Sequence, residues 1–109
     1  MVIVSLFGYN THMKFKWDKN KEKINIQKHG VSFEQASYVF ADPYALNRFD
    51  DKHSTTEDRW VLLGKSLGKT LLLVVHTFKT SFDIEHIRII SARKATRKEK
   101  QTYQERCPL

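Results

Sequence analysis

Up to about Pro43, the spacing of apolar and polar positions predicts a strand followed by a helix. Residues 14–17, KFKW, alternate polar and apolar, as the residues of a half-buried strand do. Asp18 can cap a helix over residues 19–29, and Gly30 is typical of the position just past a helix end.

A second helix is predicted from a pair of residues with capping-box spacing. Ser32 and Gln35 lie three positions apart, so each side chain can bond the backbone of the other. Apolar residues with helical spacing follow and stop before the Asp42-Pro43 pair, where a helix is expected to end. These residues are Phe33, Ala36, Val39 and Phe40. The first half therefore reads strand, helix, helix.

After Pro43 the apolar positions alternate or form continuous runs, which predicts strands. The four segments are YALNRF, RWVLLG, TLLLVVHTF and EHIRIISA. Their connections are short and rich in turn residues, and such loops favour antiparallel hairpins over parallel crossovers. We expect a four-stranded antiparallel meander in which TLLLVVHTF lies centrally, with helices on at least one face.

The C-terminal region is predicted to be a third helix. Thr96 and Glu99 again have capping-box spacing, and the helix should run to about Gln104. The expected fold class is α+β: an antiparallel sheet, made of the meander and the short N-terminal strand, packed with two N-terminal helices and one C-terminal helix.

The apolar start, MVIVSLFGYNTHM, lacks a basic region and a small-residue cleavage site, and it is too short to span a bilayer. Because the patterned sequence begins at Met13, residues 1–12 are predicted to be an extension that need not be native. An additional edge strand is the alternative for this segment. Residues 13–109 are predicted to form a single domain.

The charge of the chain suggests an anionic partner. Nineteen Lys and Arg against twelve Asp and Glu give a net charge of +7 over 109 residues. Phosphate contacts dominate nucleic-acid affinity, so a polyanion is the first candidate, and an acidic protein fits equally well. The single cysteine, Cys107, cannot form an intramolecular disulfide, which suits a reducing cytoplasm.

Several site classes are not indicated by any motif. The sequence has no GxGxxG, GxxxxGK[ST], HExxH, paired CxxC or GxSxG pattern. The five histidines are scattered rather than spaced as metal ligands. We therefore expect neither a cofactor nor a metal.

The segment HSTTEDRW brings together three residue types that could act on a phosphate. His53 is an acid or base, Glu57 is a carboxylate, and Arg59 is a cation. Polar loops carry such residues routinely, so this segment alone favours a solvated loop.

Two charged or polar residues in the following strands could add to that loop. His76 and Arg88 belong to neighbouring predicted strands, so both side chains could face one surface. An arginine in an apolar strand needs a carboxylate partner or a functional cleft. Glu57 is the first candidate partner and Glu85 the second. Regular alternation places Arg93 on the face opposite Arg88, unless the strand bends.

The segment from residue 93 to residue 106 is strongly basic. Its cations are Arg93, Lys94, Arg97, Lys98, Lys100 and Arg106, against Glu99 and Glu105. A solvated helix face and a surface that follows phosphates explain this composition equally well.

Five ordered blocks show a resemblance to a known family. With FKWDKNKEKINIQKHGVSFEQA, ADPYAL, HSTTEDRWVLLG, LLVVHT and IRIISARKATRKEK in this order, the chain resembles the BrnT family, ribonuclease toxins of bacterial type II toxin–antitoxin pairs. The resemblance runs from about Phe15 to Tyr103. It implies a RelE-like toxin domain, metal-free cleavage of RNA, and a BrnA-like antitoxin through which the complex binds operator DNA.

Carried onto this chain, the resemblance marks His53, Glu57 and Arg59 in one block, and Arg88, Arg93 and Lys94 in another. We expect cleavage by attack of the RNA 2′-OH on the adjacent phosphate. Glu57 or His53 would take the proton, and Arg88 and Arg93 would stabilise phosphate charge. His76 or Lys94 would protonate the leaving oxygen or only bind.

The predicted RNA-binding residues are Lys94, Arg97, Lys98 and Lys100. The expected result is a cytoplasmic toxin that inhibits translation. The alternative is a basic module that binds nucleic acid or a partner without catalysis.

Overall fold

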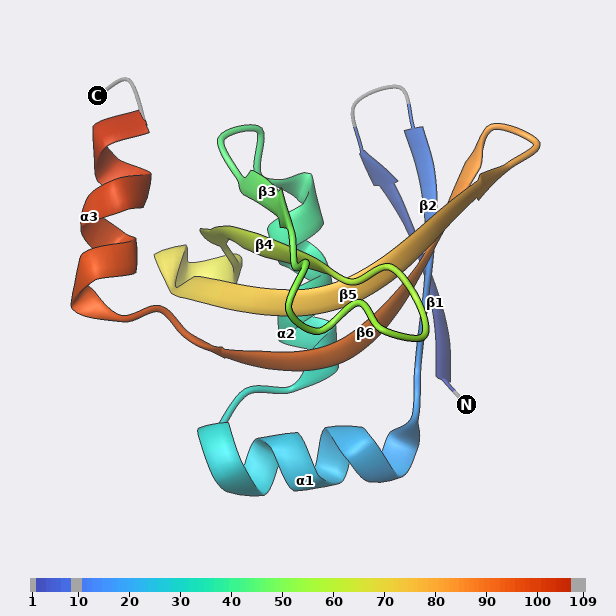
Figure 1. The fold of residues 1–109 in the computed structure, drawn as a ribbon, viewed down its shortest axis with the longest axis horizontal. Coiled ribbons are helices and arrows are strands. Elements are labelled where there is room, and N and C mark those ends of the chain that lie inside the picture. Colours follow the sequence, from blue (N-terminus) through green and yellow to red (C-terminus); the bar gives the residue numbers. More distant parts are fainter. Residues whose placement is uncertain (1, 9–10, 107–109) are drawn as a thin grey trace.

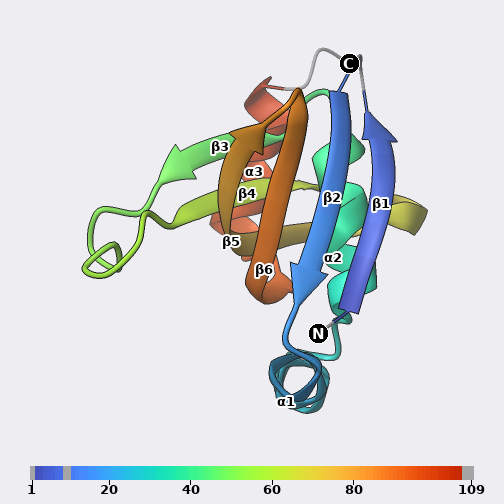
Figure 2. The same cartoon turned by 90° about the vertical axis from the view of Figure 1, so that its right-hand side faces the viewer.

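The six strands found among the described residues form one mixed sheet. The computed structural model describes residues 2–8 and 11–106, and Cys107 lies outside them. The strands are β1 (Val2–Gly8), β2 (Thr11–Trp17), β3 (Leu46–Phe49), β4 (Trp60–Lys65), β5 (Leu71–Ser81) and β6 (Ile84–Lys94). Their order across the sheet is β1-β2-β6-β5-β4-β3 (Figures 1 and 2). The predicted α+β class and the antiparallel meander, β3 to β6, are confirmed.

The N-terminal strands extend the meander in two ways that differ from the predicted antiparallel sheet. β2 pairs with β6 in parallel, so the sheet is mixed rather than antiparallel. β2 and β6 can pair in parallel because the long segment between them, which contains β3 to β5, provides the crossover that a parallel pair requires. β1 pairs with β2 and forms an edge of the sheet, which is the alternative considered for residues 1–12.

The helices begin at their predicted caps. The helical elements are α1 (Lys19–His29), α2 (Phe33–Ser37), η1 (Tyr38–Ala41), η2 (Leu67–Lys69) and α3 (Arg97–Arg106). Asp18 accepts from two backbone N–H groups of α1, Gly30 ends that helix at φ 69°, and Ser32 and Gln35 form the capping box of α2. The second helix is shorter than predicted, because it changes to a 3₁₀ turn at Tyr38. No helix among the described residues is long and apolar enough to cross a bilayer.

The main core lies between α2 and one face of the sheet. Phe33 and Ala36 of α2 pack with Phe15, Val74 and Ile87 from three strands, and all five side chains are buried. Figure 1 shows α2 behind the sheet and α1 below it, along β6. The opposite face of the sheet, which we call the open face, carries α3 at one end and, farther along, the loop between β3 and β4, whose Glu57 contacts Arg88 (Figure 2).

α3 is held on the open face by a smaller apolar cluster. Tyr103 of α3 is 1% exposed and packs with Leu63, Leu71 and Ala95. Its hydroxyl donates to Asp42 at 2.6 Å. Because this cluster occupies one end of the sheet, the rest of the open face is left for polar side chains.

One extra residue in β6 decides which side chains reach the open face. His76 pairs with Ile89 and Val75 pairs with Ser91, so Ile90 has no partner on β5. Such a bulge shifts the alternation of a strand by one residue. The buried positions accordingly change from Ile87 and Ile89 to Ala92.

The bulge brings Arg88 and Arg93 onto the same face. Arg88 pairs with Thr77 and Arg93 pairs with Leu73, and these partners are four residues apart on β5. An even separation on a strand means one face. The placement of Arg93 opposite Arg88, expected for a regular strand, is therefore wrong, and the bend considered as the exception is present.

The buried side chain of Asn25 closes the free edge of β6 beyond the bulge. β2 pairs with β6 only as far as Arg88, which leaves the edge of the following residues unpaired. The amide of Asn25 donates to the carbonyl of Ala92 at 2.8 Å and accepts from its N–H at 3.2 Å. It also donates to the carbonyl of Val31 at 2.9 Å. One side chain thus fixes α1 against the shifted half of β6.

His76 lies in the core and not on the open face. Its ring is 2% exposed and lies edge-on to Phe40, with centroids 4.8 Å apart. Burial lowers its pKa to about 4. The expectation that His76 and Arg88 share a surface is wrong, because His76 pairs with Ile89 and therefore points to the opposite side of the sheet.

We predict that Asn25→Ala destabilises the fold by about 3 kcal/mol, because it leaves buried groups of Ala92 and Val31 without partners. Urea unfolding followed by circular dichroism measures this loss. Asn20→Ala, an exposed change in the same helix, serves as the control and should stay within about 0.5 kcal/mol of wild type. Equal effects of the two changes would contradict the role given to Asn25.

The stability of the fold should fall as the pH drops from 7 to 5. The pKa of His76 is lower in the folded state than its usual 6.5, so the unfolded state binds more protons in this range and is favoured. The loss should be about 2 kcal/mol at pH 5 and about 3 kcal/mol below the folded pKa. Urea unfolding at the two pH values tests this. His76→Phe should flatten the dependence, whereas His29→Gln should keep it.

Candidate functional site

The open face carries a polar cleft where β2, β5 and β6 lie side by side. Lys16, Thr77 and Arg88 come from these three strands, and the loop between β3 and β4 adds Glu57. The cleft has a volume of about 430 Å³. Its full lining is Lys16, Glu57, Asp58, Thr77, Phe78, Lys79, His86 and Arg88. Figure 2 shows the β3–β4 loop projecting from the side of the sheet opposite α2.

An ion pair joins the loop to the sheet inside this cleft. The Arg88 guanidinium donates to a carboxylate oxygen of Glu57. Both side chains are about one-third exposed, at 34% and 38%. Glu57, the first candidate partner of Arg88, is confirmed. Glu85, the second candidate, lies on the other face of the sheet, because it is an odd number of residues from Arg88 on the same strand and pairs with Thr80.

The cleft contains a histidine that escaped the sequence-based prediction. His86 lines the cleft, two residues before Arg88 on β6. Period-two alternation places residues 86 and 88 on one face, and that spacing was the available signal. Imidazole is the side chain that most often transfers protons in enzyme sites. His86 therefore places an imidazole in the cleft with Arg88, where the sequence led us to expect that of His76.

His53 and Arg59, the other two candidate residues of the HSTTEDRW segment, lie outside the cleft lining. His53 is exposed and its Nδ1 lies 2.9 Å from an Asp50 carboxylate oxygen. The backbone N–H of Arg59 donates to the Ser54 hydroxyl at 3.0 Å, and its carbonyl accepts from the N–H of Asp50. These bonds shape the loop that carries Glu57, so both residues lie close to the cleft without lining it.

Arg93 is engaged by a carboxylate on α3. Its guanidinium donates to both oxygens of Glu99, at 2.8 and 2.9 Å. The hydrogen bonds from Arg93, with a further one from the Thr96 N–H, lower the pKa of Glu99 to about 2. The same bonds to Glu99 raise the pKa of Arg93. Arg93 and Arg88 are separated by four positions of β5, about 13 Å along the strand. In this structure the two guanidiniums are held by different carboxylates, Arg88 by Glu57 and Arg93 by Glu99.

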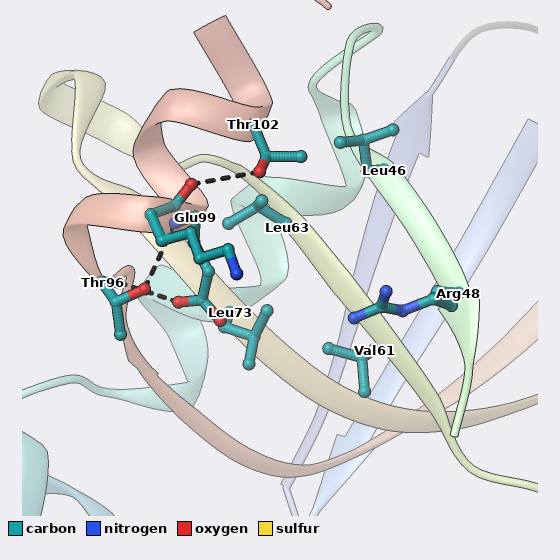
Figure 3. A pocket seen from close by; sticks show the side chains of 9 residues that line it. Leu46, Arg48, Val61, Leu63, Leu73, Thr96, Glu99 and Thr102 are labelled. Atoms are coloured by element: carbon teal, nitrogen blue, oxygen red, sulfur yellow. Dashed lines mark hydrogen bonds between the residues drawn. The ribbon is translucent and has the colours of Figure 1, made fainter. Parts of the chain in front are cut away.

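A groove of about 550 Å³ continues the open face between the sheet and α3. Figure 3 shows Val61, Leu63 and Leu73 along its floor, with Arg48 on one side and Glu99 on the other. Lys98 lines it as well. The groove combines an apolar floor with charged side chains at its sides, the cations Arg48 and Lys98 and the carboxylate of Glu99.

The four predicted RNA-binding residues do not share one surface of α3. Lys98 faces the groove, whereas Lys94 and Lys100 line a separate hollow on the other side of the helix, and Arg97 is exposed. Within the part of the chain that the structure describes, no three His, Cys, Asp or Glu side chains gather as metal ligands would.

The cleft brings together groups that can act on an RNA phosphate. Arg88 and Lys16 can bind the phosphate oxygens, and cations aimed at developing charge stabilise a transition state. Glu57 and His86 can accept and donate protons. The arrangement has the elements of general acid–base catalysis at a phosphate centre.

Comparison with known proteins identifies the family of the chain. The family described as "Ribonuclease toxin, BrnT, of type II toxin-antitoxin system" matches residues 17–99. The crystal structure of the Brucella abortus ribonuclease toxin BrnT is similar, with a TM-score of 0.51 and 25% identity over 76% of this chain and 96% of that chain. No curated protein matches the chain. The chain belongs to the BrnT family of ribonuclease toxins of type II toxin–antitoxin systems.

Proposed function

We propose that this chain is an endoribonuclease that cleaves RNA in the cleft without a metal ion. The 2′-oxygen of the substrate forms a bond to the adjacent phosphorus, and the bond from phosphorus to the 5′-oxygen breaks. The products carry a 2′,3′-cyclic phosphate and a 5′-hydroxyl. The observation that carries this proposal is the Glu57–Arg88 pair beside His86 and Lys16 in one cleft.

The pairing of Glu57 with Arg88 suits both residues to this reaction. A phosphate that enters the cleft competes with Glu57 for the Arg88 guanidinium and leaves the carboxylate free to accept the 2′-OH proton. Arg88 then faces the phosphate, where negative charge builds up. The pair thus keeps a partly exposed guanidinium matched with an acceptor while no substrate is bound.

The second proton transfer is assigned to His86. The leaving 5′-oxygen needs a proton, and His86 lies two residues from Arg88 on the same strand face. Glu57 and His86 could also exchange these roles. His53, Arg59 and His76 do not line the cleft, so they have no catalytic role in this proposal.

The groove beside α3 is proposed to hold RNA that flanks the cleaved bond. Arg48 and Lys98 provide cations for backbone phosphates, and the apolar floor suits a base. Arg93 lies between the cleft and the groove, where its pairing with Glu99 orients it. We assign Arg93 to RNA binding rather than to the transition state.

We expect the wild-type protein to cleave a long unstructured RNA in the presence of EDTA. Arg88→Ala and Glu57→Gln should each lower the rate by roughly 10²-fold or more, because each removes a group that acts in the transition state. Product ends mapped by enzymatic labelling should carry the cyclic phosphate. Glu34→Gln, an exposed change on α2, is the matched control and should cleave normally.

Two results would contradict this mechanism. Strict dependence on Mg²⁺ would exclude metal-free cleavage, and unchanged rates in folded Arg88→Ala and Glu57→Gln variants would place the reaction elsewhere. A folded wild type that binds RNA without cleaving it would favour a non-catalytic binding module.

We also propose that a BrnA-like antitoxin neutralises this toxin in the cytoplasm and brings the complex to operator DNA. Support comes from membership in a type II toxin–antitoxin family. A tagged Arg88→Ala variant, which should not harm cells, should co-purify from the native host with a second protein. Adding that protein to the wild type should stop RNA cleavage and allow binding to the operon's own promoter. Repeated isolation of the toxin alone would count against this partner.

A further inference from the structure

Four lysines surround a hollow on the side of α3 that faces away from the cleft. Lys65, Lys69, Lys94 and Lys100 come from β4, η2, the end of β6 and α3, respectively. We call this hollow, of about 440 Å³, the lysine pocket. The other lining residues are uncharged: Thr70, Leu71, Tyr103 and Gln104.

The charge of the lysine pocket is not balanced by its lining. No carboxylate lines it, and among the described residues none of the four lysines forms an ion pair. Asp42 lies behind Tyr103, where it accepts from the Tyr103 hydroxyl at 2.6 Å and from the Lys65 N–H at 2.8 Å. Four ammonium groups brought together in this way repel one another, and a bound anion would relieve that repulsion.

Cations continue from the cleft to the lysine pocket. Along β6, the positions of Arg88 and Lys94 pair with residues five apart on β5, about 16 Å along the strand. This odd separation places Lys94 on the opposite face at the strand end, so an RNA that joins the two sites must pass around that end of the sheet and cover more than this distance. Arg93 lies on β6 between them, and Arg97 and Lys98 lie on α3 between the groove and the pocket. A long anion with regularly spaced charges can follow such a series, whereas a short acidic peptide needs only one end of it.

We propose that the lysine pocket binds a backbone phosphate of single-stranded RNA, several nucleotides away from the phosphate that is cleaved. The proposal rests on the proposed function, because it takes the RNA in the cleft as the molecule that extends to the pocket. Lysine suits this role, since its ammonium is a point charge with rotatable donors that needs no fixed ligand geometry. Short RNA can reach only the cleft, and long RNA can reach both sites.

The test compares two triple variants that lose the same charge. One variant changes Lys69, Lys94 and Lys100 of the pocket to Gln, and the control changes Lys19, Lys23 and Lys28 of α1 to Gln. The probe is a 2′-O-methyl RNA of about 20 nucleotides, which cannot undergo 2′-OH attack. At about 3.4 Å per stacked nucleotide it spans several times the ~16 Å that separates the two sites along the strand, which leaves length to pass around the end of the sheet. Binding is measured by fluorescence anisotropy across a range of salt concentrations.

Salt dependence should separate the two variants. Each neutralised phosphate contributes about 0.7 to the slope of log K against log salt for single strands, so the pocket variant, which loses one bound phosphate, should lose about 0.7 from that slope. Between about 50 and 200 mM salt, wild-type affinity should then fall about 3-fold more than that of the pocket variant. The α1 variant should keep the wild-type slope, and a Lys→Arg version of the pocket variant should restore it.

The outcomes distinguish this proposal from the proposed function. Cleavage of a trinucleotide by wild type tests the cleft alone, because its adjacent phosphates cannot span both sites. If wild type does not bind the long RNA, or if both triple variants bind it with the same slope, the pocket is not an RNA site. A pocket variant that loses only the antitoxin would likewise overturn the proposal and assign the pocket to an acidic protein segment. Circular dichroism verifies that every variant is folded.

Discussion

The single unpaired residue of β6, Ile90, is the feature on which the arrangement of both faces depends. Before it, the strand alternates so that Ile87 points into the core and Arg88 points out; after it, Ala92 is buried and Arg93 points out. In a regular strand, side chains alternate between the two faces without interruption. If Ile87 and Ile89 pointed into the core, Ala92 would then point to the open face and Arg93 into the core. Asn25 supports this arrangement by pairing with Ala92 on the part of the strand edge that β2 no longer covers.

Local features of this fold could be predicted from the sequence, whereas the phase of the strands could not. Caps such as Asp18, Gly30 and the Ser32–Gln35 pair depend on a few adjacent residues, and the structure has them as predicted. The face to which a side chain points depends on pairing across the whole sheet. His76 was therefore placed on the wrong face, and His86, which shares the face of Arg88, was overlooked.

Two arginine–carboxylate pairs set the electrostatics of the open face, and they differ in character. The Arg93–Glu99 pair is bidentate and part of the capping box of α3, which gives it a structural role at the start of that helix. The Glu57–Arg88 pair joins a loop to a strand and is bordered by a hollow large enough for a ligand. Only the second pair can exchange its partner for a phosphate without loosening a helix end.

The β3–β4 loop lies outside the ladder of the sheet, although it supplies a carboxylate to the cleft. Changes in its length or sequence leave the pairing of β3 with β4 and the core intact, and loops tolerate such changes better than strands do. Arg88, in contrast, lies on a strand that cannot be altered without disturbing the core. In related proteins, evolution can therefore change the loop carboxylate of this cleft independently of the strand arginine, on an unchanged scaffold.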